Sequence, residues 1–183
     1  MTELSDLVRL LLERSVRHGH FVLASGATST YYIDARLTTM SAQGLALIGR
    51  MGLRTIRQAG WTPQAVGGLT MGADPVAYAV ARATVDEGPV IQAFSVRKSA
   101  KEHGTGKRIE GNFAAGNQVV VIEDVITSGG SARQAIDAVE SEGGKVLGIL
   151  AVVDREAGGR QLLEQLGYQV VALTTVSDLG LKK

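Results

Sequence analysis

The segment that decides the fold is Val119–Ser131, which reads VVVIEDVITSGGS. Its first four residues, 119–122, are all branched and apolar, as in a strand of a parallel sheet that is buried on both faces. Two carboxylates, Glu123 and Asp124, follow this strand directly. Carboxylates next to a phosphate site repel the phosphate unless they meet hydroxyl groups or a cation, and the vicinal diol of a ribose is a natural partner.

The residues after the acid pair predict a phosphate cradle. Gly129 and Gly130 let the backbone turn so that several N–H groups point into one concavity, and the helix that begins at Ser131 adds the partial positive charge of its N-terminus. The hydroxyl groups of Thr127 and Ser128 supply further donors. The alternative is a strand, turn and capped helix without a ligand, and the neighbouring acid pair argues against it. Neither G-x-x-x-x-G-K-[ST] nor G-x-G-x-x-G occurs in the chain, which excludes the two other common nucleotide loops.

On both sides of this segment, hydrophobic patterning predicts alternating helices and strands. The alternation indicates an α/β fold with a mostly parallel sheet flanked by helices, whose crossovers are right-handed. Because the carboxyl ends of parallel strands share one rim, we expect the loops after Leu69, Val96, Ile122 and Val153 to lie together. The expected helices are 4–15, 41–58 with Ser41 as its cap, 75–84, 131–142 and 160–166, and the expected strands are 21–23, 31–33, 65–69, 90–96, 119–122, 146–153 and 169–173.

Length and composition narrow the class of protein. The 183 residues suit one domain, with 19 basic against 18 acidic side chains, so the net charge gives no reason to expect binding to nucleic acid or a membrane. The absence of cysteine excludes disulfides, thiolate metal sites and cysteine nucleophiles. No apolar run approaches the roughly 20 residues that span a bilayer, and the N-terminus lacks the basic start of a secretory signal. We therefore expect a cytoplasmic protein.

Three further segments carry unusual polar chemistry. Arg97–Arg108 packs five Lys or Arg residues and one His into twelve positions, as expected of a basic loop that closes over a polyanion, although a solvated surface loop is the alternative. The segment 67–75, GGLTMGADP, is a glycine-rich turn between a strand and a helix. At the end of another strand, Arg155 offers a planar guanidinium that suits a carboxylate in a bidentate pair, and a surface salt bridge with Asp154 or Glu156 is its alternative.

Together these segments resemble the type I phosphoribosyltransferases, and most closely their orotate phosphoribosyltransferase branch. The resemblance extends over nearly the whole chain, in five ordered segments. It implies a single domain over residues 1–183, with a small N-terminal hood over about 1–40 and a core sheet over about 60–175. The implied reaction joins orotate to phosphoribosyl diphosphate, giving orotidine 5′-monophosphate and diphosphate in de novo pyrimidine (UMP) biosynthesis.

The resemblance also implies a role for each matching residue. Lys101, His103 and Asp124 are the expected catalytic residues, with either Lys101 or His103 as proton donor, and Thr127 and Arg155 are expected to bind orotate. The backbone N–H groups around residues 70–73 are expected to approach the diphosphate. The residues expected to bind phosphoribosyl diphosphate are Arg97, Lys98, Lys101, His103, Glu123, Asp124, Val125, Ile126, Thr127, Ser128, Gly129, Gly130 and Ser131.

The same resemblance implies a cofactor and a partner. Mg²⁺ is expected to bridge the oxygens of the substrates, with no firm protein ligand and with Asp124 assisting through water. A homodimer is expected, in which the Arg97–Arg108 loop reaches the neighbouring subunit's site. The chain departs from the family at the hood turn, where Ala24 and Ala27 stand in place of a substrate-binding lysine. Tyr31 and Tyr32 pack either on the base or in the core.

Two other functions compete with this interpretation. The first is the same fold acting on a purine or uracil, against which Arg155 and the basic loop argue, while the missing hood lysine favours it weakly. The second is a non-catalytic regulator that senses phosphoribosyl diphosphate and binds nucleic acid. Near-neutral charge and single-domain length argue against that regulator.

Overall fold

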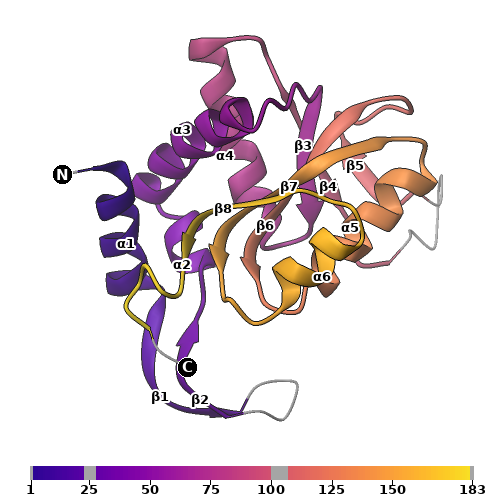
Figure 1. Cartoon of the computed structure of the whole chain (residues 1–183). Coiled ribbons are helices and arrows are strands. Elements are labelled where there is room, and N and C mark those ends of the chain that lie inside the picture. The colour runs from indigo at the N-terminus through magenta and orange to yellow at the C-terminus, as the bar shows by residue number, and fades with distance from the viewer. Residues whose placement is uncertain (1, 23–27, 100–106, 182–183) are drawn as a thin grey trace.

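Alternating strands and helices build a six-stranded sheet with helices on both faces (Figure 1). The computed structural model describes residues 2–22, 28–99 and 107–181. Within this six-stranded sheet, neighbouring strands pair in parallel except β5, which runs antiparallel to β4. The predicted α/β architecture with a mostly parallel sheet is confirmed. Across the sheet the order is β5 (Ile109–Gly111), β4 (Gln92–Val96), β3 (Ala65–Leu69), β6 (Gln118–Ile126), β7 (Lys145–Asp154) and β8 (Val170–Thr175).

Strand β6 separates two hydrophobic clusters. Val120 and Ile122 belong to a cluster with α1 (Glu3–Arg14), α3 (Ala42–Gln58) and α4 (Ala73–Glu87), whereas Val119 and Val121 belong to a cluster with α5 (Gly130–Ser141) and α6 (Gly159–Gln165). Successive side chains of a strand point to opposite faces, so the uninterrupted apolar run is what a sheet covered on both sides requires. Among the described helices, none is both long and apolar enough to cross a bilayer.

The N-terminal hood consists of α1, the hairpin of β1 (Val16–Val22) and β2 (Thr28–Ile33), and the short helix α2 (Arg36–Thr39) (Figure 1). It shares one hydrophobic cluster with the main sheet, in which Leu11 and Tyr31 are found with Leu150 of β7. This shared packing fixes the end of β2 above the rim of the sheet.

The structure extends the predicted elements at several points. The predicted strand 119–122 continues to Ile126, because the ladder to β7 runs on until Ile126 pairs with Asp154. Strand pairing uses backbone N–H and C=O groups, so the polar side chains of Glu123 and Asp124 do not end it. The acid pair therefore lies on the strand itself and not in the loop. Ser41 does cap α3, with its Oγ accepting from the Gly44 N–H at 3.0 Å. The short elements α2 and β5 were not predicted.

The order of the strands reverses between β3 and β6, which places a topological switch point there. The ladder between these two strands ends where Gly67 pairs with Val121, while β6 continues along β7 for five more residues. A crevice therefore opens at the carboxyl ends of β3 and β6, the usual place for a ligand in an open α/β sheet.

Candidate active site

A pocket of about 460 Å³ occupies this crevice. All four strands whose loops were expected at one rim contribute to it, and the hood closes one side. The expectation that these loops lie together is confirmed. The lining residues are Tyr32, Ile33, Asp34, Arg36, Leu69, Thr70, Met71, Gly72, Ala73, Lys98, Glu123, Asp124, Val125, Thr127, Ser131 and Arg155.

The phosphate-cradle loop is held against the start of α6. The Gly159 N–H donates to the carbonyl of Thr127 at 3.0 Å. Gly129 caps α5 with a φ of 79°, and a Cβ on it would lie 3.1 Å from the carbonyl oxygen of Gly159. Both the backbone conformation and the close approach require glycine at this position. The first N–H groups of α5 have no acceptor within the helix, so they and the exposed hydroxyls of Thr127 and Ser131 are available to an anion.

The acid pair is held in an environment that disfavours its charge. The side chain of Glu123 is only 6% exposed, and burial, with the nearby charge of Asp124, raises the pKa of Glu123 to about 8. Burial also raises the pKa of Asp124, although its Oδ1 accepts from the Val125 N–H at 2.8 Å. A Cβ on Gly72 would lie 2.6 Å from the Asp124 carboxylate, so glycine is needed for this close approach. Ligands that donate hydrogen bonds or carry positive charge would relieve both carboxylates.

The turn after β3 is fixed by a hydrogen-bond network around Asp74. The carboxylate of Asp74 accepts from Thr70 Oγ1 at 2.5 Å and from Ser95 Oγ at 2.7 Å, and Tyr78 OH lies 2.8 Å from Ser95 Oγ. These contacts hold the backbone of residues 70–73 at the edge of the pocket. Sequence reasoning did not single out Asp74, although an acidic residue in the first turn of a helix is a recognisable signal.

Arg155 points its guanidinium toward the hood. Its Cζ lies 5.2 Å from the centre of the Tyr31 ring, which is the geometry of a cation–π contact. The two flanking acids are engaged elsewhere, since Asp154 accepts from the Glu156 N–H and Glu156 accepts from Ser177 Oγ at 2.6 Å. This arrangement argues against the surface salt bridge as the purpose of Arg155. Of the two tyrosines, Tyr31 is buried in the core, while Tyr32 is 41% exposed and lines the pocket.

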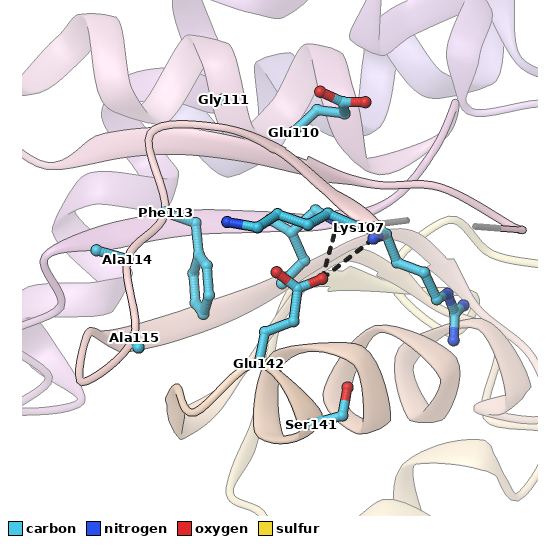
Figure 2. Close-up of a pocket in the computed structure, with 10 residues that line it drawn as sticks. Lys107, Glu110, Gly111, Phe113, Ala114, Ala115, Ser141 and Glu142 are labelled. Atoms are coloured by element: carbon cyan, nitrogen blue, oxygen red, sulfur yellow. Dashed lines mark hydrogen bonds between the residues drawn. The ribbon is translucent and has the colours of Figure 1, made fainter. Parts of the chain in front are cut away.

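The basic segment is divided between the pocket and its surroundings. Lys98 lines the pocket, whereas Nη1 of Arg97 lies 3.9 Å from Glu110 on β5. Lys101 and His103 lie outside the described residues, as does the hood turn with Ala24 and Ala27. A separate cavity of about 650 Å³ lies beside Lys107 and the end of α5 (Figure 2). The acid pair does not line this cavity.

The remaining residues that were predicted to bind phosphoribosyl diphosphate differ in how exposed they are. Val125 lines the pocket, Ser128 and Gly130 are exposed, and the side chain of Ile126 is buried in the core. Any contact from Ile126 to a ligand would therefore come from its backbone. Sequence reasoning also missed Asp34 and Arg36, whose signal was a charged pair, Asp-Ala-Arg, directly after a predicted strand.

The sheet order, the glycine-rich cradle and the adjacent acid pair together define a type I phosphoribosyltransferase. The family model for the phosphoribosyl transferase domain matches residues 40–168. At 18% identity, an adenine phosphoribosyltransferase of Saccharomyces cerevisiae shares this fold with a TM-score of 0.68, over 92% of this chain and 99% of that one.

Two comparisons narrow the family further. The orotate phosphoribosyltransferase of Rhodopirellula baltica is 40% identical over 184 residues, covering 98% of this chain and 95% of that protein. The orotate phosphoribosyltransferase of Mycobacterium tuberculosis H37Rv, crystallised with 5-phospho-alpha-D-ribosyl 1-diphosphate, superposes with a TM-score of 0.83 at 38% identity, over 98% of this chain and all of that one. The chain belongs to the orotate phosphoribosyltransferases.

Proposed function

We propose that this chain transfers the phosphoribosyl group of phosphoribosyl diphosphate to orotate, giving orotidine 5′-monophosphate and diphosphate in pyrimidine biosynthesis. The bond from the anomeric carbon to the diphosphate oxygen breaks, and a bond from that carbon to a ring nitrogen of orotate forms. One observation carries the proposal: Glu123 and Asp124 line a single pocket together with Thr127 and Ser131 of the phosphate cradle and with Arg155. A ribose over the acid pair would place its 5-phosphate in the cradle and its base toward Arg155.

In this proposal the residues act mainly through charge. Positive charge develops on the ribose ring as the anomeric bond breaks, and Glu123 and Asp124 would anchor the ribose hydroxyls and stabilise that charge. Arg155 and Thr127 would bind orotate, the former through its carboxylate. Lys98 and the N–H groups around residues 70–73 would bind diphosphate. Orotate brings a ring nitrogen that is readily made anionic, so no strong base is needed from the protein.

The residues of the pocket suit a Mg²⁺ ion that enters bound to the substrate and lies near the acid pair. Among the described residues, no group of three or more acidic or histidine side chains could hold a metal by itself, so substrate oxygens would supply most of its ligands. Asp124, whose charge is disfavoured by burial, would contribute through water. When bound, the metal would neutralise part of the charge of the diphosphate.

The dimer and the roles of Lys101 and His103 are part of the same proposal. The two side chains would steady the departing diphosphate, and either could donate a proton to it. They would do so in the site of the neighbouring subunit of a homodimer in the cytoplasm. The position of Arg97 favours this arrangement, because its side chain lies toward Glu110 and does not line the pocket of its own chain.

The first experiment follows the ultraviolet absorbance of orotate. We expect purified protein to consume orotate only when both phosphoribosyl diphosphate and Mg²⁺ are present. Diphosphate release with adenine, hypoxanthine or uracil, but none with orotate, would contradict the assignment of Arg155 while leaving the fold unchanged. If no base were consumed and no diphosphate released, a non-catalytic regulator that senses phosphoribosyl diphosphate would be the better interpretation.

A further inference from the structure

Arg36 is a cation of the pocket that takes no part in the proposed mechanism. It begins α2, directly after the hood hairpin, and its guanidinium is locked by Asp34. Nε donates to Oδ1 at 2.8 Å and Nη2 donates to Oδ2 at 3.0 Å, and the Arg36 N–H also donates to Oδ1 at 3.2 Å. This contact holds the pKa of Asp34 below its usual value, so the pair stays ionised. Among the described residues, contacts use two of the five N–H donors of the guanidinium, and the other three are available to a ligand.

The position of Arg36 relates it to the turn after β3. Arg36 lines the pocket with Thr70–Ala73, and it also lines a neighbouring cavity of about 440 Å³ together with Met71. It is close enough to the acid pair for its charge to lower the pKa of Asp124, against the larger effect of burial. The side chain is 47% exposed, so an anion can reach it.

The two pocket arginines belong to opposite sides of the acid pair. Arg155 follows β7, which neighbours β6 on one side, while the turn that approaches Arg36 follows β3, the neighbour of β6 on the other side. A group that enters at a sugar carbon with inversion approaches the face opposite the leaving group. With the ribose over Glu123 and Asp124 and the base at Arg155, the leaving group would therefore be on the side of Arg36.

We propose that Arg36, oriented by Asp34, binds the diphosphate of phosphoribosyl diphosphate and of the product. This inference rests on the proposed function and adds to it a residue from the hood. The guanidinium is always charged and offers a fork of donors that matches phosphate oxygens. It belongs to the same chain as the cradle, so it would hold the leaving group independently of the Arg97–Arg108 loop.

The test measures binding of inorganic diphosphate, in the presence of Mg²⁺, by titration calorimetry on the full chain without orotate. We expect Arg36→Gln to weaken diphosphate binding about 10- to 100-fold, as the loss of charge-assisted hydrogen bonds should. Arg36→Lys keeps the charge but loses the fork and should fall between wild type and Arg36→Gln. Arg82→Gln is the matched control, because Arg82 forms an equally short pair with Asp86, 2.8 Å, on the exposed face of α4.

Steady-state kinetics separate the diphosphate site from the base site. For Arg36→Gln we expect the KM for phosphoribosyl diphosphate to rise about 10- to 100-fold, as the affinity for diphosphate falls. The KM for orotate should stay within about twofold of wild type. Diphosphate binding equal to that of wild type, or a rise in KM for orotate alone, would overturn the inference. If wild type bound diphosphate but did not consume orotate, the proposed reaction would fail, and the calorimetric comparison of the two proteins would still decide the role of Arg36.

Discussion

Glu123 is the residue at which burial and function conflict most directly. It is almost fully buried beside a second carboxylate, and its pKa is raised from 4.5 to about 8. Near neutral pH the ligand-free site therefore holds a proton on Glu123. A ligand whose hydroxyl groups donate hydrogen bonds to Glu123, or a cation nearby, would favour the ionised carboxylate and release that proton.

This conflict predicts how stability depends on pH. Between pH 4.5 and 8, folded Glu123 binds a proton that the unfolded chain has lost, so the free energy of unfolding should fall as pH rises. The slope from this one group is at most about 1.4 kcal/mol per pH unit. Glu123→Gln removes the titrating group, and urea unfolding of the ligand-free variant should lose this contribution.

The comparison is made at pH 5, 6.5 and 8, with Glu13→Gln as the control. Glu13 is an exposed residue of α1 paired with Arg9, so its substitution should leave the pH dependence of wild type unchanged. Parallel pH profiles for wild type and Glu123→Gln would mean that Glu123 has an ordinary pKa in the folded protein.

At the scale of elements, helix α5 connects the predicted phosphate cradle to the basic segment. The cradle loop leads into its N-terminus, and Glu142 follows its last residue. The carboxylate of Glu142 accepts from the N–H groups of Arg108 and Ile109, at 3.1 and 3.3 Å, as the dashed lines in Figure 2 show. The Arg97 N–H in turn donates to the carbonyl of Arg108 at 2.8 Å, so both ends of the basic segment are held together and tied to α5.

We predict that Glu142→Ala lowers kcat about tenfold. The two backbone N–H groups that fix the C-terminal end of the basic segment would lose their acceptor. Glu142→Gln retains an acceptor oxygen and should restore most of the rate. The measurement is turnover at saturating substrates, with the thermal midpoint recorded for each variant.

Glu140→Ala controls for damage to the helix, since Glu140 accepts from Tyr168 OH elsewhere on α5. Equal kcat values for Glu142→Ala and wild type, or equal loss in the Ala and Gln variants, would argue against a positioning role for Glu142.

At the scale of the whole molecule, the central question is whether one chain completes a site. The pocket of a single chain contains the cradle, the acid pair, Arg36 and Arg155. The proposed homodimer adds Lys101 and His103 from its partner. This arrangement makes a prediction that no single-chain site would share.

Two inactive variants should complement each other in mixed dimers. Lys101→Ala removes a residue that acts in the neighbouring subunit's site, whereas Asp124→Asn removes a residue of its own pocket. In each hybrid dimer, the pocket of the Lys101→Ala chain receives an unchanged loop from the other chain, so one site is intact. Random exchange should recover about a quarter of wild-type activity, because half of the dimers are hybrids with one good site. The measurement is orotate consumption after co-expression with two different tags.

A mixture of Lys101→Ala with His103→Ala is the control. Both changes are on the donated loop, so each hybrid site would receive one damaged loop and no activity should return. If the first mixture also stayed inactive although hybrid dimers were isolated, the loop would act in its own subunit.

The sequence by itself determined the α/β order and the succession of apolar run, acid pair and glycine-rich turn before a helix. These features depend on local chemistry, because an apolar run, a glycine pair and a helix start are encoded within Val119–Ser131. Hydrophobic periodicity likewise predicted the helix capped by Ser41 and the strand β3 with its bounds. Roles for Arg97, Lys101 and His103 came from family resemblance and remain predictions.

Only the tertiary structure decided the contacts between distant segments. Asp74 meets Ser95 across 21 positions, and Glu142 meets Arg108 across 34, so no local pattern could pair them. The extension of β6 through the acid pair depends on β7, and the place of Arg36 in the pocket depends on how the hood packs over the sheet. Sequence periodicity reports which residues are buried, whereas the partners of polar groups are set by the packing of whole elements.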